Sequence, residues 1–401
     1  MNKSSSRPAL PSLTALRAAA ALAVFGYHAA GMLQFLGTGH VARAASRLLA
    51  AGPTGVSFFF VLSGFVLTWS AGSSWTAGSF WRRRAARILP AYLVAWCLGL
   101  IVLAGLHHSA PVGGAIASLF LVQAWSPDHN VTFAANIVAW SLAVEAFFYL
   151  LFPVLLPSLR RLPIARRRPL MIVLLVIPLI VATAEQVLHG SAGYLWPVAY
   201  LPIARLPEFL LGSLLALEIA DGRWPRIPLW VAASFAAVGY LLACRVPQAF
   251  MWVSITLAPF VLLIGAAATC DLLERRSPLR ASSVVRLGVW SYGFYLLQVP
   301  IGLVLAKVMH PIDHHAVTDV LLAGTYLMVT WLAAAALFRW VEEPAHRLLL
   351  HGPGAVGIPA RAPVMSDTAA APAVSERQSE SLSNAALADA ILPVPLSEES
   401  P

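Results

Sequence analysis

Ten long apolar runs, separated by short polar segments, constrain this chain more than any other feature. Each run is close to the length that a helix needs to cross a bilayer core of about 30 Å. Backbone groups in lipid must satisfy their own hydrogen bonds, so we expect an all-α, polytopic membrane protein. The runs cover residues 13–35, 52–70, 88–106, 133–157, 169–187, 198–220, 228–244, 249–270, 284–306 and 319–341.

An eleventh apolar stretch, residues 111–125, is short for a span and contains Pro111 and a glycine pair. We expect it to be a re-entrant or interfacial segment. Counting it as a crossing would separate the arginines of 82–87 from those of 160–168. If it does not cross, most basic loop residues lie on one side, which the positive-inside rule assigns to the cytoplasm. We therefore expect a bacterial inner-membrane protein with both termini in the cytoplasm.

Only four basic loop residues are left on the outer side by this topology: Arg43, Arg47, Arg245 and Lys307. The formal net charge of +9 could suggest a nucleic-acid partner, but only 11% of residues are charged and 59% are hydrophobic. Membrane topology and attraction to anionic lipid explain most of the basic residues. The expected partner is therefore the lipid bilayer, with no nucleic acid.

Composition divides the chain into two parts. Residues 1–350 form the expected membrane domain, whereas residues 351–401 are rich in Ala, Ser, Pro and Glu without periodicity, which predicts a disordered cytoplasmic tail. The three cysteines lie in apolar stretches without metal-ligand spacing, so we expect packing roles and no metal site. They are Cys97, Cys244 and Cys270.

Arg17 and His28 interrupt the first apolar run, which we interpret as an uncleaved span rather than a signal peptide. They are separated by about three helical turns, so they project from the same face roughly 16 Å apart. Ionisable side chains in a bilayer are expensive and mark functional sites. We expect both to line one cavity, with His28 suited to proton transfer. The alternative is a structural hydrogen bond made by His28 across a helix interface.

Glu145 is expected near the middle of the run at 133–157, in a polar seam with Asn136, Trp140 and Ser141. A buried carboxylate is normally protonated or paired, and His28 or Arg17 is the expected kind of partner. The seam therefore indicates either part of an active site or an interhelical hydrogen-bond network.

Four arginines, Arg82, Arg83, Arg84 and Arg87, begin the third run. They are either topological charge with snorkelling side chains or a site for an anionic phosphate ligand. Arg84 and Arg87 are one turn apart, which favours a shared ligand.

Two further polar groups lie inside spans. Arg205 and Glu208 share a helix face and are expected to form a structural ion pair. Tyr292, Tyr295 and Gln298 form a stripe at helical spacing, which is typical of contacts between helices.

Several motifs, in this order, resemble the membrane-bound acyltransferase family 3. They extend over about residues 10–347 and comprise Arg17 with ten residues before His28, GVSFFFVLSGF at 55–65, Arg84-x-x-Arg87 followed by Ile88 and Pro90, WSLAVE at 140–145, SYGFYLLQVP at 291–300 and VEEP at 341–344. The chain departs from the family at Gln298, where many members have a histidine.

The resemblance implies a ten-helix transferase that moves an acyl group, commonly acetyl, from cytoplasmic acyl-CoA to a hydroxyl. Family members modify bacterial surface polysaccharides, Nod factors and macrolides. The opening RPALPSLTALRAAAALAVFGYHA and the lack of an appended hydrolase-like domain resemble the members that acylate macrolides. The essential Arg and His of the family correspond to Arg17 and His28, and its Arg-x-x-Arg motif corresponds to Arg84 and Arg87.

From these residues we expect His28 to act as general base, Glu145 to orient His28, and Arg17 to hold the donor or stabilise developing negative charge. A transient acyl-histidine is a second route. Acyl-CoA is a co-substrate, and no cofactor is expected. The substrate-binding residues are predicted to be Arg82, Arg84, Arg87, Trp140, Ser141 and Tyr295.

A transporter or exporter is the alternative from another functional class, because ten spans with charges at the membrane midplane also describe one. The sequence shows no inverted repeat and no matching pair of Gly/Pro-broken spans, and its arginine cluster lies at an interface. These features favour the enzyme.

Overall fold

The computed structural model describes residues 7–33, 35, 39–72, 76–190, 195–309 and 316–351. Within these residues every regular element is helical, so the all-α prediction is confirmed. The predicted tail lies outside the described residues except for His351. The α-helices are α1 (Pro11–Tyr27), α2 (His40–Leu49), α3 (Thr54–Ser70), α4 (Ala77–Gly105), α5 (Val112–Leu119), α6 (His129–Thr132), α7 (Trp140–Arg161), α8 (Ile164–His189), α9 (Leu206–Ala220), α10 (Leu229–Ala243), α11 (Gln248–Leu272), α12 (Ser282–Met309), α13 (Ala316–Leu337) and α14 (Glu343–His351).

Shorter helical turns join or extend these helices. The π-helical turns are η1 (His28–Met32), η5 (Trp196–Tyr200) and η8 (Phe338–Glu342), and the 3-10 turns are η2 (Gln123–Trp125), η3 (Ile137–Ala139), η6 (Pro202–Arg205) and η7 (Pro278–Arg280). Two of the π-helical turns, η1 and η8, directly extend the ends of α1 and α13.

Eight helices in the described part of the chain are long and apolar enough to cross a membrane, and they correspond to eight of the ten predicted runs. The other two runs form the 15-residue helices α9 and α10. The expected continuous helix over 198–220 is wrong. Its chain passes through η5, an extended residue at Leu201, and η6 before α9 begins. Pro202 and Pro207 lack the N–H groups that a continuous helix would use here.

The segment 111–125 does not cross the bundle. Its helix α5 has eight residues, a rise of about 12 Å, and ends before Leu121, whose φ is positive. Ser118 attaches α5 to α4, because its carbonyl accepts from the Tyr92 hydroxyl and its Oγ accepts from Trp96 Nε1 at 2.8 Å. The prediction of a segment that does not span is confirmed.

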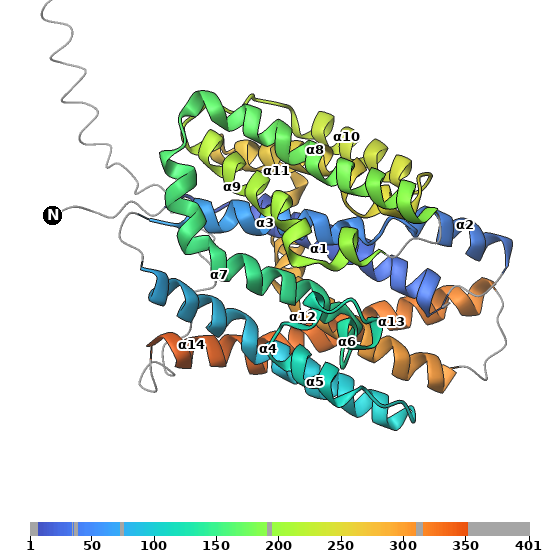
Figure 1. Ribbon diagram of the computed structural model, residues 1–401. Helices are drawn as coiled ribbons and strands as arrows, with labels where there is room; N and C mark the ends of the chain where they lie inside the picture. The colour runs from blue at the N-terminus through green and yellow to red at the C-terminus, as the bar shows by residue number, and fades with distance from the viewer. Residues whose placement is uncertain are drawn as a thin grey trace, which may run out of the picture. The chain divides into compact units, whose positions relative to one another are not determined.

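The described chain begins and ends at the same end of the bundle, which we call the Arg84 end. There the Ser12 amide donates to Asp271 Oδ2 at 2.8 Å, which joins the start of α1 to the end of α11. Arg87 of α4 lies 3.4 Å from Glu342, just before α14. Figure 1 shows α14 and the start of α4 at this end and α2 at the other, which we call the α2 end.

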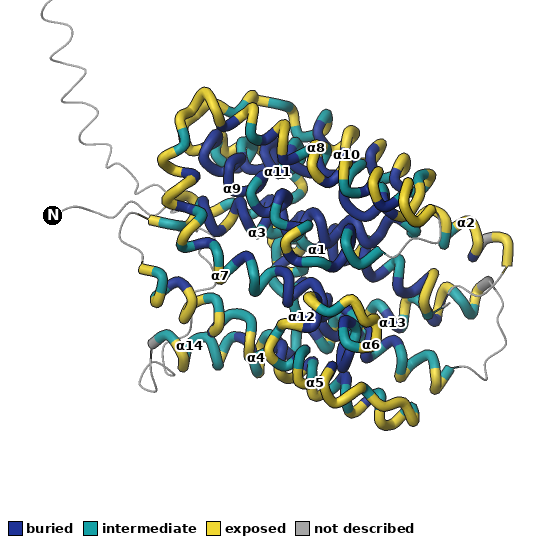
Figure 2. Tube along the Cα trace, in the orientation of Figure 1, coloured by how far each residue is buried: buried dark blue, intermediate teal, exposed yellow. Residues whose placement is uncertain are grey.

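Helix α3 lies at the centre of the bundle and crosses α9 with the two backbones in contact. A Cβ on Gly212 would lie 1.8 Å from the Val61 carbonyl oxygen, and one on Gly64 would lie 1.9 Å from that of Phe209. Small residues allow this approach between membrane helices. Figure 2 shows α1, α3, α9 and α11 largely buried, with exposed residues concentrated on the outer helices. This central packing positions α1 and α3 as walls of the candidate site.

Candidate active site

A pocket of about 170 Å³ lies among α1, α3, α4, α7 and α12. Six of the nine predicted site residues line it: Arg17, Arg84, Arg87, Ser141, Glu145 and Tyr295. These residues come from four helices that are distant in sequence. The tertiary structure therefore unites the arginine motif, the first-span arginine and the polar seam of α7 in one site.

Glu145 is the carboxylate at the centre of the pocket's hydrogen bonds. Its Oε1 accepts from Ser63 Oγ at 3.0 Å and from the Tyr149 hydroxyl one turn along α7. Arg17 is half-buried and interacts electrostatically with Glu145, so of the two partners expected for this carboxylate the arginine is the one near it. Buried charges require such partners.

The expected orientation of His28 by Glu145 is wrong. The hydrogen-bonding neighbour of the His28 ring is the Gln298 side chain, and His28 Nδ1 has no partner in the described part of the chain. His28 also does not line the pocket. The Tyr295 ring packs edge-to-face on Phe59, and both line the pocket, whereas Gln298 is one turn farther along α12. The cavity that we expected Arg17 and His28 to share therefore ends before His28.

Ser141 and Tyr295 form a polar contact in the pocket wall. Ser141 Oγ and the Tyr295 hydroxyl are 2.8 Å apart, and they lie 3.1 and 3.2 Å from the Val138 carbonyl oxygen. Because each hydroxyl has one proton, one of them donates to the other and the second donates to Val138. Gln298, the neighbour of His28, is three residues after Tyr295 on α12. Along this helix, Tyr295 is therefore the pocket residue closest to the neighbour of His28.

Arg84 and Arg87 have different surroundings at the other side of the pocket. Arg87 lies 3.4 Å from Glu342, whose side chain is 1% exposed and whose two oxygens accept no hydrogen bond from the described residues. Arg84 lies over the Phe80 ring, and its Nε has no partner among the described residues. The lining carries three guanidinium groups and one carboxylate, so the pocket favours an anionic ligand.

Two predicted substrate-binding residues lie outside the pocket. Arg82 is exposed on α4, because it precedes Arg84 by two residues and so projects from another face of the helix. Trp140 is buried behind the pocket wall, where its ring packs on Phe60 and Tyr200. Neither side chain is therefore positioned to contact a ligand in this pocket.

The predicted ion pair of Arg205 and Glu208 is confirmed, although the helix expected to carry both residues is interrupted before α9. Arg205 Nε donates to Glu208 Oε1 at 2.7 Å, and both side chains are fully buried. The same guanidinium donates to the Ala199 carbonyl and to Ser57 Oγ. Arg205 thus joins η5, α3 and the start of α9 beside Phe60, a residue of the pocket wall.

Four lining or supporting residues were missed as site residues: Ser63, Tyr149, Tyr292 and Glu342. All four carried a signal in the sequence, because Tyr149 is one turn from Glu145 and the other three lie in the motifs at 55–65, 291–300 and 341–344. Tyr292 was interpreted only as an interhelical contact, and its hydroxyl does donate to the Ile88 carbonyl. Glu342 faces the site because the π-helical turn η8 changes the side-chain register at the end of α13.

A family model described as an acyltransferase domain matches residues 10–339. The chain belongs to this acyltransferase family. The match covers every helix that lines the pocket, so the family's common structure contains the candidate site. The protein is an acyltransferase, and this assignment favours the enzyme over the transporter alternative.

Named relatives of this acyltransferase agree with the family match. The chain is 34% identical over 358 residues to acyltransferase MdmB of Streptomyces mycarofaciens, covering 85% of this chain and 92% of that protein. It is 26% identical over 373 residues to peptidoglycan O-acetyltransferase OatA of Listeria monocytogenes, covering 85% of this chain and 56% of the relative. The chain thus spans about half the length of the peptidoglycan enzyme. No solved structure matches.

Proposed function

We propose that this acyltransferase is an integral membrane O-acyltransferase that moves an acyl group, most simply acetyl, from acyl-CoA to a hydroxyl of a macrolide or a carbohydrate. The observation that carries the proposal is the pocket in which Arg17, Arg84 and Arg87 meet a single lining carboxylate. Guanidinium groups bind phosphates by charge-assisted, often bidentate, hydrogen bonds. Coenzyme A carries its phosphates at one end and its thioester at the other.

The pocket's size supports partial insertion of the donor. At about 170 Å³ it is smaller than the roughly 300–1,000 Å³ typical of sites for drug-sized ligands. The phosphates would lie at its arginine side, and only the narrow pantetheine arm would enter between the helices. With the Arg84 end in the cytoplasm, as the basic loops predict, the arginines face the compartment that supplies acyl-CoA.

His28 is the proposed general base. The acceptor hydroxyl oxygen attacks the thioester carbonyl while its proton passes to the imidazole, and collapse of the tetrahedral intermediate forms the ester and releases the CoA thiolate, which takes up the proton. Nδ1, which has no partner among the described residues, accepts that proton in the tautomer that carries its hydrogen on Nε2.

Arg17 is three turns from His28, so its proposed role is donor binding rather than stabilisation of the oxyanion. The Ser141 and Tyr295 hydroxyls, 2.8 Å apart, are better placed to stabilise the oxyanion, because the hydroxyl that donates to the Val138 carbonyl can turn to donate to the oxyanion instead. Because His28 does not line the pocket, transfer requires the thioester to reach beyond the present lining, of which Tyr295 and Phe59 are part.

The test is a release assay with the purified full-length protein. Acetyl-CoA is supplied with a macrolide, a sugar polymer or no acceptor, and both free CoA and the acylated product are measured. We expect CoA release in equal amount to acylated product with one of the acceptors. Acyl transfer from a different activated donor, with acetyl-CoA inert, would overturn the donor assignment.

A further inference from the structure

A second hollow lies at the α2 end, between α2 and α10, and shares no lining residue with the pocket described above. Its volume is about 840 Å³. Leu48, Val238, Leu241 and Leu242 form its apolar walls, each between 50% and 55% exposed. In a membrane protein such a groove is open to the hydrocarbon of the bilayer.

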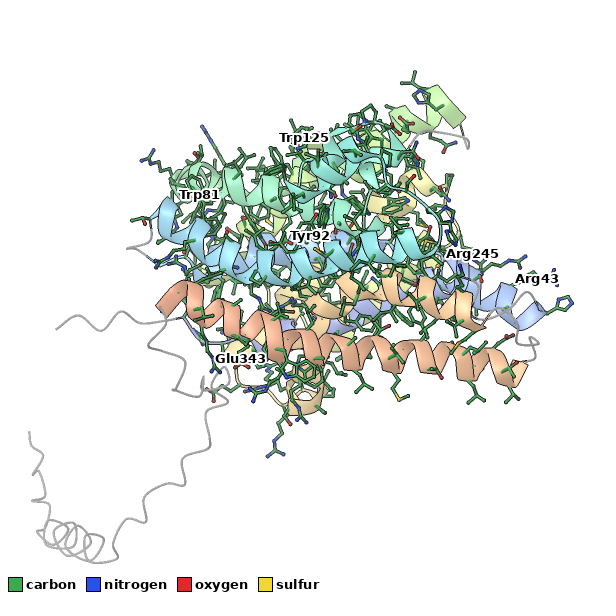
Figure 3. The ribbon with its side chains drawn as sticks, turned by 90° about the horizontal axis from the view of Figure 1, so that it is seen from below. Arg43, Trp81, Tyr92, Trp125, Arg245 and Glu343 are labelled. Atoms are coloured by element: carbon green, nitrogen blue, oxygen red, sulfur yellow. The ribbon has the colours of Figure 1, made fainter. Side chains whose placement is uncertain are left out.

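Two arginines, Arg47 and Arg245, line the same groove. Both are exposed, and neither forms an ion pair with a carboxylate of the described residues. Arg43 is one turn before Arg47 on α2, a helix whose sequence contains no acidic residue. Figure 3 shows Arg43 and Arg245 at the same end of the bundle. Like charges at this spacing destabilise a helix unless an anion compensates them.

Membrane topology does not explain these charges. Arg43, Arg47 and Arg245 are three of the four basic loop residues that lie opposite the basic side of the protein. The positive-inside rule disfavours them there. Two of them, Arg47 and Arg245, line one groove, and Arg43 is one turn from Arg47, which indicates a local anionic ligand.

The groove is held open by contacts on both sides of α2. Ser46 Oγ donates to the Ala30 carbonyl at 3.2 Å, which attaches α2 to η1. Cys244 Sγ lies 3.3 Å from the Leu48 carbonyl oxygen, which attaches α2 to the end of α10. Both arginines are thus carried by helices whose spacing is already set, so a ligand need not bring them together.

We infer that this groove binds an anionic phospholipid of the surrounding bilayer. The lipid phosphate would accept from the guanidinium groups of Arg47 and Arg245, and an acyl chain would cover Leu241 and Leu242. Free phosphate would use the arginines but leave the apolar walls uncovered. A zwitterionic lipid would satisfy the walls but bring no net negative charge.

The experiment measures binding of phosphatidylglycerol to the delipidated full-length protein in a non-ionic detergent by native mass spectrometry. At about fivefold in affinity per interfacial arginine, R47Q/R245Q should bind phosphatidylglycerol about 25-fold more weakly than the wild type. The matched control R226Q/R276Q removes two exposed arginines from the Arg84 end, outside the groove, and should weaken binding much less than R47Q/R245Q does. R47K/R245K keeps the charge and should retain most of the binding.

Parallel arms distinguish the sources of phosphate. Phosphatidylcholine should bind far more weakly than phosphatidylglycerol, and inorganic phosphate at millimolar concentration should not displace the bound lipid. Thermal unfolding of each variant verifies that the fold is intact. Equal binding of phosphatidylglycerol by R47Q/R245Q and the wild type, equal binding of the two lipids, or displacement by inorganic phosphate would each overturn the inference.

Discussion

Each of the three pocket arginines has a different electrostatic environment. Arg17 is near Glu145, Arg87 is 3.4 Å from Glu342, and Arg84 retains an unpartnered Nε among the described residues. Arg84 is therefore the residue whose removal disturbs the fewest protein contacts. It provides the cleanest test of phosphate binding.

We predict that Arg84→Gln raises the KM for acyl-CoA with little change in the KM for the acceptor. Loss of one charge-assisted hydrogen bond costs about 1.5–3 kcal/mol, which is roughly a 10- to 150-fold change. Steady-state kinetics with each substrate varied in turn measures both constants. Arg82→Gln is the matched control, because it removes the same charge from an exposed position outside the pocket. A similar KM change in both variants would indicate a general effect of charge at the membrane surface.

His28, like Arg84, has a nitrogen without a partner among the described residues, and in His28 this nitrogen is Nδ1 of the ring. We predict that His28→Ala lowers the rate of acyl transfer by about 10²–10⁴, the contribution of a general base. His108→Ala, at an exposed position in the segment after α4, is the control and should keep full activity. If His28→Ala folds normally and retains more than about a tenth of the activity, His28 is not the base.

The irregular backbone between η5 and α9 is stabilised by one buried ion pair. The fully buried Arg205 and Glu208 hold this irregular backbone against α3, through the Ala199 carbonyl and Ser57 Oγ. Removing one partner leaves an uncompensated charge in a low-dielectric interior.

We predict that Arg205→Met destabilises the protein by about 3–5 kcal/mol, and that Arg205→Met combined with Glu208→Leu recovers much of this loss. Unfolding in a graded denaturing detergent measures the differences. Arg347→Gln, which breaks the part-exposed pair with Glu343, should change stability by about 0–1 kcal/mol. A double variant no more stable than Arg205→Met would show that the hydrogen bonds to η5 and Ser57 outweigh the ion pair.

The crossing of α3 and α9 makes a second prediction for the elements. Gly212→Ala places a Cβ 1.8 Å from the Val61 carbonyl oxygen, so the helices must separate and stability should fall by about 1–3 kcal/mol. Gly113→Ala, in α5, meets nothing within 4 Å and serves as the control. Thermal unfolding measures the stability of both variants. Equal stabilities would mean that the two helices separate without loss of stability.

For the whole molecule, orientation in the membrane decides whether the arginines can meet cytoplasmic acyl-CoA. The ends of the described chain meet at the Arg84 end, where Ser12 bonds to Asp271 and Arg87 pairs with Glu342. The basic loops predict that this end is cytoplasmic.

We predict that a cysteine at Thr318 reacts with a membrane-impermeant thiol reagent on intact cells and that one at Ser79 does not. The background lacks the native cysteines, Cys97, Cys244 and Cys270. Ser79 lies at the start of α4 and Thr318 at the start of α13, at opposite ends of the bundle. Permeabilised cells, in which both positions should react, provide the control. Reaction of Ser79 on intact cells would place the arginine pocket on the wrong side for acyl-CoA.

Much of this architecture follows from local properties of the sequence. Apolar length determined the membrane class, and the shortness of 111–125 correctly predicted a segment that does not cross. Residue type and helical spacing also singled out Arg84, Arg87 and Glu145, which line one pocket in the structure. Such features are readable because hydropathy and helical periodicity depend only on neighbours in the chain.

Only the tertiary structure decided how distant helices combine these groups. Helical spacing predicted one cavity for Arg17 and His28, but the packing of α3 and α12 puts Phe59 and Tyr295 in the pocket wall and leaves His28 beside Gln298. It likewise paired Glu145 with Ser63, and Arg87 with Glu342, across more than eighty residues of sequence. Contacts between helices depend on the packing of all their side chains, and the periodicity of a single helix contains no information about its partners.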